Sequence, residues 1–438
     1  MKLTDLTRIT RRLVLMLSGE AMQSGFHFAL NIALLRVLSA RDFGVFAIVM
    51  VIGGLGLAYI RALTAMPATV LIGRSRTRRA ADAYDVTFGS GAVLLSTLIA
   101  IGVVLLLNVW LDSGALAGGC FVGLWSMRSY LRVAFFARRR QRAATIGDFA
   151  FILSGAVISF ALWGNGENLL PRIFLALAVA NAIGIAVMLV LSRRPFRISY
   201  RNRVRQRYAR LWDQLGWSGL SVTAANLQGQ AVALLVTAFG GPAAYAPIAA
   251  TLVLFSPLRV IATALGNMLQ PELSGELARG EAGHVWHQTK VWSFIAGLVG
   301  LVYGAVIIII LPRIDSHALQ GSPVRLIGFF ACVIYTMIML YVMPRILLEV
   351  MTAFRTVALI TAGAGVVGAA LVVAILFVAP PANALAGGAV SEALVVAASW
   401  VVVYRRLHRA RAGAEAEIPD LLYGPHPSAQ STASRTKR

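Results

Sequence analysis

Apolar runs of roughly bilayer length recur along the whole chain and are separated by short polar or charged interruptions. A bilayer core of about 30 Å requires about 20 mainly apolar residues for each helix that crosses it. Cutting the chain at clusters of charge, proline or glycine predicts an all-α integral membrane protein with about twelve transmembrane helices. These cover residues 13–38, 43–71, 84–108, 115–137, 147–163, 169–191, 214–239, 244–270, 290–311, 325–348, 355–378 and 383–404.

The longest internal connection divides these helices six and six. We expect an N-terminal six-helix lobe (1–192), a basic cytoplasmic linker (193–213), a C-terminal six-helix lobe (214–404) and a disordered cytoplasmic tail (405–438). An even number of helices in each lobe predicts two halves related by an axis along the membrane normal. In the linker, apolar residues at helical spacing among arginines indicate a helix on an anionic lipid surface; a solvated basic loop is the alternative.

The distribution of basic residues fixes the expected orientation. The chain has a formal net charge of +22, with 40 Lys and Arg against 18 Asp and Glu. If both termini are cytoplasmic, 31 basic residues fall on the cytoplasmic side, 5 on the outer side and 4 inside spans. This asymmetry predicts an even number of helices and places both termini in the cytoplasm. Because the excess charge follows the loops, it indicates membrane topology and no nucleic-acid partner.

Composition and motifs argue against other classes of protein. With 58% hydrophobic and 13% charged residues, the chain differs from both soluble and disordered proteins. It contains no phosphate-binding loop, acidic metal motif or nucleophile elbow, so we expect no enzyme and no catalytic residues. The two cysteines, Cys120 and Cys332, lie in apolar helices. They suggest no disulfide framework and no metal site, and we expect no cofactor.

Polar residues inside the first helix of each half predict a wet cavity between the lobes. In the first predicted helix they recur at spacings of three and four and therefore share one face: Glu20, Gln23, His27 and Asn31. In the seventh, the corresponding residues are Thr223, Asn226 and Gln230. A histidine packed in a helix interior is the ordinary alternative for His27.

Three arginines inside spans are the candidates for substrate binding. Arg61, Arg128 and Arg259 all lie near mid-depth or in the inner half of their predicted helices. A charge in a span costs at least about 2.5 kcal/mol and persists mainly where it faces protein or water. Arginine can bind a pyrophosphate or an acidic sugar bidentately, so the three predict an anion receptor. The alternatives are local ion pairs or extension to the membrane surface.

Two acidic residues inside spans are candidates for ion coupling. Glu392 stands near the middle of the twelfth predicted helix, and Glu20 lies in the first. A carboxylate desolvated in the membrane can take up and release a proton, which would couple transport to H⁺ or Na⁺. The alternative for Glu392 is that it is a counter-ion to one of the arginines. Arg61 lies at a depth similar to that of Glu20, and its alternative role is a structural ion pair.

A segment at the junction of the first two predicted helices resembles a known family. Residues 33–48 read ALLRVLSARDFGVFAI, with Arg36, Asp42, Phe43-Gly44 and Phe46 at the defining positions. This resembles polysaccharide and lipid-linked oligosaccharide flippases (the Wzx-like polysaccharide transporters) of the multidrug/oligosaccharidyl-lipid/polysaccharide exporter (MOP) superfamily. A Gly-Pro turn at Gly241-Pro242, followed by Tyr245, is similar to the family's matching turn.

The resemblance implies a MATE-like exporter fold, with two six-helix lobes around a central cavity that opens alternately to either side. It also implies a substrate, an undecaprenyl-pyrophosphate-linked oligosaccharide moved to the outer leaflet during polysaccharide biosynthesis. Polysaccharide polymerase or assembly proteins would then be partners, beside membrane lipid. The alternatives are a cation-coupled drug antiporter of the same superfamily, a major-facilitator transporter, or a non-transporting component of a polysaccharide-assembly complex.

Overall fold

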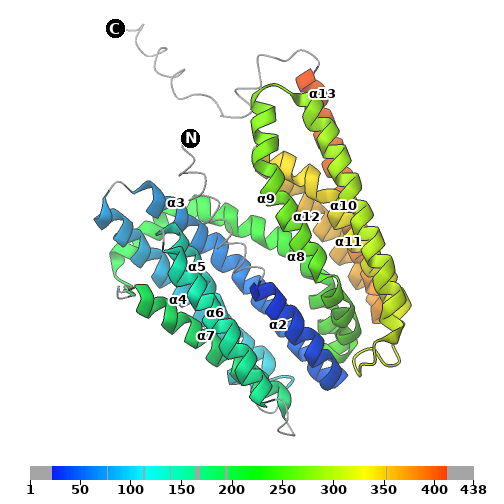
Figure 1. Ribbon diagram of the computed structural model, residues 1–438, viewed down its shortest axis with the longest axis horizontal. Coiled ribbons are helices and arrows are strands. Elements are labelled where there is room, and N and C mark those ends of the chain that lie inside the picture. Colours follow the sequence, from blue (N-terminus) through cyan, green and yellow to red (C-terminus); the bar gives the residue numbers. More distant parts are fainter. Residues whose placement is uncertain are drawn as a thin grey trace. The chain divides into compact units, whose positions relative to one another are not determined.

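The computed structural model describes residues 22–75, 77–111, 114–138, 140–162, 168–192, 196–351 and 353–411, and all regular structure in this part is helical (Figure 1). A first helix covers residues 22–37. The others are α2 (Ala40–Ile60), the π-helix η1 (Arg61–Ala65), α3 (Met66–Arg74), α4 (Arg78–Leu107), α5 (Ala115–Ala137), α6 (Gln141–Leu162), α7 (Leu169–Ser192), α8 (Asn202–Leu254), α9 (Ser256–Ala278), α10 (Ala282–Ile310), α11 (Val324–Val350), α12 (Phe354–Val378) and α13 (Leu385–Arg411). Short 3₁₀ helices cover Leu311–Arg313 and Pro381–Ala384.

The helices match the predicted spans, and the predicted fold class is confirmed. In the described part, nine helices are long and apolar enough to cross a membrane. The remaining predicted spans correspond to residues 22–37, to α5 and to α9. The rod formed by α2, η1 and α3 is one span, whereas α8 turns at Gly241, where φ is 77°. This left-handed conformation suits glycine and separates two consecutive spans at the predicted Gly-Pro turn.

Two predicted boundaries differ in the structure. The helical run of α8 starts at Asn202, inside the predicted linker, and continues without a break into the following span. The last helix, α13, extends to Arg411, seven residues into the predicted tail. Arginines at that end favour the continued helix because their charge opposes the negative end of the helix dipole. Residues 412–438, which make up the rest of the predicted tail, lie outside the described part.

The chain forms two compact units. Unit 1 comprises Met1–Asn226, Gly240–Ala250 and Asp315–Gln320, and unit 2 comprises Leu227–Phe239, Thr251–Ile314 and Gly321–Arg438. The boundary between them first falls inside α8, after Asn226. Two short segments from the second half of the sequence therefore belong to unit 1.

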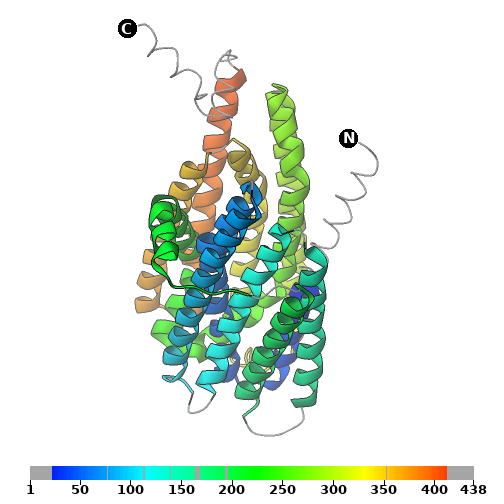
Figure 2. The ribbon, with the colours of Figure 1, turned by 90° about the vertical axis from the view of Figure 1, so that its left-hand side faces the viewer.

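In unit 1, helices α4 to α7 run side by side: α5 packs on α4 and α7, and α6 packs on α7 (Figures 1 and 2). Glycines allow this close approach. A Cβ atom on Gly119 would lie 2.7 Å from the carbonyl oxygen of Ala100, and one on Gly123 would lie 3.2 Å from that of Ser96. Gly44 is tighter still, because a Cβ atom there would lie 1.9 Å from the carbonyl oxygen of Pro242. A side chain at Gly44 or Gly119 would therefore require the backbone to shift.

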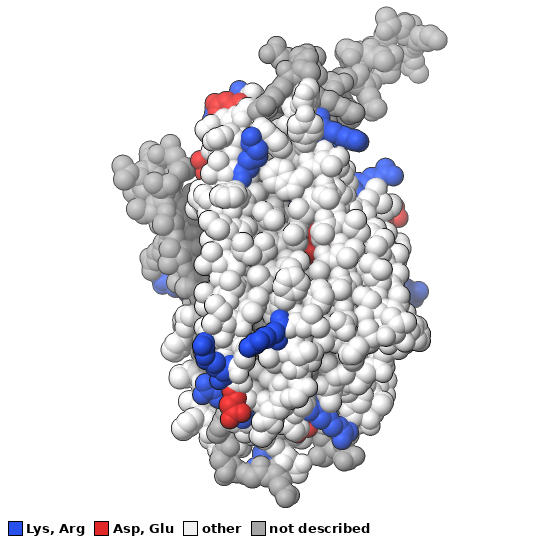
Figure 3. Space-filling model, turned by 90° about the vertical axis from the view of Figure 1, so that its right-hand side faces the viewer, with Lys and Arg blue, Asp and Glu red and all other residues white. Residues whose placement is uncertain are grey.

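In unit 2, α11 packs on α10 and α13, and α13 also packs on α12. A buried cluster that includes Leu273, Val285, Met343, Leu347 and Val403 joins these helices at one end. On the face shown in Figure 3, charged side chains gather towards the two ends and most of the middle carries none. Large apolar side chains of α10 are exposed, for example Phe294 at 70% and Ile309 at 62%. Such a surface is what a surrounding bilayer requires.

Candidate functional site

A buried ionic network occupies the interior of unit 1. Its centre is Arg128 on α5, whose side chain is 1% exposed. Its Nη1 donates to Oδ1 of Asp148 on α6 over 2.5 Å, and its Nε donates to Oδ1 of Asn181 on α7 over 2.8 Å. The guanidinium also lies 3.9 Å from the centre of the Phe151 ring. Three neighbouring helices thus hold this one charge, which has no exposed surface with which to meet a ligand.

Asp148 completes the network and was missed by the sequence prediction. Its other oxygen, Oδ2, lies 2.9 Å from Nε of Arg132, one turn after Arg128 on the same helix. Asn181 is fixed in turn, because its Nδ2 donates to the carbonyl oxygen of Leu177 over 2.7 Å. Of the three roles that the sequence left open for Arg128, its contacts favour the local ion pair.

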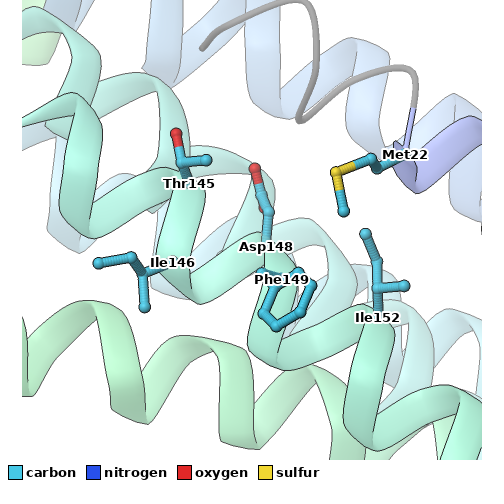
Figure 4. Close-up of a pocket in the computed structure, with 6 residues that line it drawn as sticks. All are labelled: Met22, Thr145, Ile146, Asp148, Phe149 and Ile152. Atoms are coloured by element: carbon cyan, nitrogen blue, oxygen red, sulfur yellow. The ribbon is translucent and has the colours of Figure 1, made fainter.

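A pocket of about 250 Å³ lies beside Asp148 (Figure 4). It is lined by Met22 of the first helix and by Thr145, Ile146, Asp148, Phe149 and Ile152 of α6. Nearly all of this wall is apolar, and the Asp148 carboxylate is already engaged by two arginines. The pocket therefore lacks the positive groups that an anionic headgroup would need.

The polar stripe of the first helix packs largely against its own unit. The His27 ring lies 5.3 Å from that of Trp125 and 5.9 Å from that of Phe151, which is the ordinary packed arrangement. Asn31 is 8% exposed and donates to the backbone oxygen of His27 over 2.7 Å. Gln23 is half-buried. Glu20 lies outside the described residues.

Arg61 is exposed and begins the π-helix η1. At about 1.5 Å per residue, it lies about 30 Å from the start of α2 and about 20 Å from the end of α3. Two residues earlier, the hydroxyl of Tyr59 lies 2.8 Å from that of Thr223 on α8. The middle of this span therefore carries a positive charge and two hydroxyl groups on unit 1.

The other polar residues predicted to line a cavity follow Thr223 along α8. Thr223 is exposed, and its hydroxyl donates to the backbone oxygen of Gly219 over 2.9 Å. Asn226 and Gln230 are both half-buried. Asn226 belongs to unit 1 and Gln230 to unit 2, so the predicted stripe crosses the boundary between the units.

Glu392 on α13 is the buried acid of unit 2, at 7% exposed. The side-chain amide of Gln228 on α8 donates to its Oε1. The positive charges of Arg259 and Arg345 also act on this carboxyl group. The backbone of Gln228 can approach α12 because Gly365 lies opposite it. A Cβ atom on Gly365 would lie 3.0 Å from the backbone nitrogen of Gln228. Gln228 was not predicted, since no feature of its surrounding sequence marks it.

Arg259 is exposed near the start of α9, in the middle of the rod that begins at Gly241. The helix is interrupted at Phe255, between α8 and α9, and Pro257 follows in the first turn of α9. The guanidinium lies 5.7 Å from the centre of the Tyr335 ring on α11, within the range of a cation–π contact. Thus Arg61 and Arg259 are exposed on their own units, whereas Arg128 is enclosed.

The described residues contain no group of three or more His, Cys, Asp or Glu side chains that could hold a metal ion. Cys120 is exposed and Cys332 is buried, and neither forms a disulfide. Of the charged side chains singled out from the sequence, Arg128 and Glu392 are buried and hydrogen-bonded. Arg61 and Arg259 are exposed.

Comparisons with known proteins identify the fold. The sequence matches no family model and no curated protein. The structure is similar to an inward-facing multidrug resistance transporter of the MATE family, in the MOP superfamily, with a TM-score of 0.65 and 12% identity over 89% of this chain and 96% of that one. It is also similar to a eukaryotic MATE transporter, with a TM-score of 0.60 and 13% identity over 93% and 99% of the two chains.

A third similar structure is a MOP superfamily transporter from Pyrococcus furiosus, with a TM-score of 0.54 and 12% identity over 92% of this chain and 96% of that one. The binding pocket of that transporter has reverse polarity, which suggests a different function for it. The chain thus has the two-lobe fold of MATE transporters, and these structural neighbours are transporters rather than enzymes.

Proposed function

We propose that this protein is an exporter of MATE-type fold that moves an undecaprenyl-pyrophosphate-linked oligosaccharide, the repeat unit of a surface polysaccharide, from the inner to the outer leaflet of the bacterial inner membrane. The observation that carries the proposal is the pair of exposed arginines in the middle of membrane spans, Arg61 on unit 1 and Arg259 on unit 2. Both termini are cytoplasmic in this proposal, and a polysaccharide polymerase or other assembly proteins consume the product.

The chemistry of these arginines supports an anionic substrate. An exposed guanidinium within a span is costly unless water or a ligand solvates it, and a pyrophosphate offers oxygen pairs that match its two parallel N–H bonds. A transporter of organic cations needs negative groups at the same places. The Pyrococcus furiosus transporter, described as having a pocket of reversed polarity, supports the idea that one fold serves substrates of opposite charge.

Arg128 has a different role in this proposal. Its enclosure by Asp148, Asn181 and Phe151 supports a structural part in unit 1. Of the three arginines predicted to bind substrate, Arg61 and Arg259 remain the candidates in this proposal.

The second candidate is a cation-coupled drug antiporter, and Glu392 is the observation that favours it. A buried carboxyl group held by Gln228 can bind H⁺ or Na⁺ and link its movement to that of a substrate. The two candidates share this coupling residue and differ in the substrate. Glu392→Gln would abolish coupling in both, so only the arginines distinguish them.

The test is surface glycan production in a strain that depends on this protein. We expect Arg61→Ala and Arg259→Ala each to abolish surface glycan while membrane insertion stays normal. Arg61→Lys and Arg259→Lys should restore it only in part, because an ammonium keeps the charge and loses the bidentate geometry. Arg325→Ala, an exposed arginine at the start of α11, is the matched control. Full glycan in both alanine variants would overturn the proposal and leave the antiporter.

A further inference from the structure

The π-helix η1 interrupts an otherwise regular membrane rod at Arg61. Its wide turn is closed by the backbone N–H of Met66, which donates to the carbonyl oxygen of Arg61, five residues earlier. Such turns are rare, and they occur often at functional sites. The described ends of this rod are both α-helical, so the widening is local.

The cause of the wide turn is Pro67, the second residue of α3. Proline has no backbone N–H, and its ring collides with the carbonyl group four residues earlier, here that of Leu63. Widening the preceding turn moves this carbonyl away from the ring. One backbone oxygen at each end of the turn accepts a hydrogen bond from a hydroxyl group. The Thr64 hydroxyl donates to the backbone oxygen of Ile60 over 2.5 Å, and the Thr69 hydroxyl donates to that of Ala65 over 2.9 Å.

A second helix fixes the turn from outside. Ser218 on α8 donates to the carbonyl oxygen of Ala62, inside η1, over 3.4 Å. Gly219 leaves room for Leu63, whose Cδ2 would lie 3.5 Å from a Cβ atom there. One turn further along α8, Thr223 meets Tyr59. Contacts on both sides of Arg61 thus hold the wide turn against α8, all within unit 1.

The extra residue in the turn changes how the two ends of the rod face their neighbours. Adding one residue to a turn rotates the helix before it by about 100° relative to the helix after it. Both α2 and α3 pack on α4 and α5, so the rotation brings an apolar side of each end onto the same neighbours. Within η1, Ala62, Thr64 and Ala65 are buried, whereas Arg61 is exposed.

We propose that the π turn positions the Arg61 guanidinium for an anionic headgroup, with Pro67 and Ser218 as the positioning residues. This inference rests on the proposed function, because it takes Arg61 as a substrate ligand. Neither Pro67 nor Ser218 contacts the substrate in this scheme. They act by keeping the turn wide, and so by keeping Arg61 on the exposed side of the rod.

The first readout is the chemical accessibility of position 61. In a background with Cys120→Ser and Cys332→Ser, Arg61→Cys is labelled in membrane vesicles with a positively charged methanethiosulfonate reagent. We expect Pro67→Ala to slow labelling because an alanine N–H restores the α-helical bond and rotates position 61 towards its neighbours. The matched control is Pro344→Ala, which removes another intrahelical proline, from α11. That change should leave labelling at position 61 unaltered.

The second readout is transport with Arg61 intact, measured as flipping of a fluorescent polyprenyl-pyrophosphate disaccharide in proteoliposomes. Pro67→Ala and Ser218→Ala should each raise the half-saturating substrate concentration about tenfold, the worth of one charge-assisted hydrogen bond. Where Pro67→Ala fails to fold, Ser218→Ala decides. Unchanged labelling and unchanged half-saturation in the folded variants would overturn the inference. Full transport by Arg61→Ala would instead overturn the proposed function.

Discussion

Arg128 and Arg61 lie on helices of the same unit that contact each other, and their surroundings are opposite. Arg128 is held by a carboxylate, an amide and a ring, with 1% of its side chain exposed. Arg61 is exposed and begins the π-helix η1. A buried guanidinium must find all its partners in the protein, whereas an exposed one in a span remains available to water or ligand. Burial therefore separates a structural arginine from a binding one.

Removal of the Asp148 carboxylate should give the largest loss of stability. Asp148→Ala leaves Arg128 buried without its counter-ion, and breaking one side of a buried ion pair costs about 3–5 kcal/mol. We expect a large fall in the thermal unfolding midpoint of the detergent-solubilised protein. Glu349→Ala breaks the exposed pair with Arg345 on α11 and is the matched control. Such a surface pair contributes about 0.3–0.5 kcal/mol, so equal effects of the two variants would contradict the comparison.

Loss of the Asn181 side chain should give an intermediate effect. Asn181→Ala removes the acceptor of the Arg128 Nε–H and leaves the ion pair with Asp148 in place. The cost of a buried donor without a partner is about 1–3 kcal/mol. The unfolding midpoint should fall less than in Asp148→Ala. In the double variant the two losses should not add, because both act through Arg128.

Truncation of Arg61 should have the smallest effect on stability. For Arg61→Ala we expect a change within about 0.5 kcal/mol, as for exposed positions in general, together with the loss of transport proposed above. Arg128→Ala should instead lower the unfolding midpoint in the same thermal assay, because it destabilises the protein. A destabilisation by Arg61→Ala as large as that by Arg128→Ala would show that both arginines are structural.

Most of the fold was predictable because each membrane helix must satisfy its backbone within itself and bury or face lipid with its apolar side chains. The length of the apolar runs and the charges between them therefore located the spans, including those that correspond to α5 and α9. The boundary between the units inside α8 could not be predicted in the same way. It depends on which neighbours each part of a continuous helix contacts.

The candidate site was predictable only in part. The depth of Arg61, Arg128 and Arg259 follows from their position in a span, but the partner of each is a tertiary fact. Asp148 lies twenty residues after Arg128, at the edge of a predicted helix, where an acid is unremarkable. The polar stripe was ambiguous for a different reason. Asn31 donates to the backbone of its own helix, and a spacing pattern cannot distinguish that from a side chain facing a cavity.

The pairing of Arg128 with Asp148 also bears on how the chain enters the membrane. The two residues lie on consecutive helices, α5 and α6, joined by a short connection. Each charge alone disfavours passage from the translocon into lipid by about 2.5–3.5 kcal/mol. When α5 and α6 form their ion pair before the hairpin enters lipid, the charge of Asp148 is already neutralised at entry. The order of these helices along the chain thus lets biosynthesis deliver a buried charge that neither helix could insert cheaply by itself.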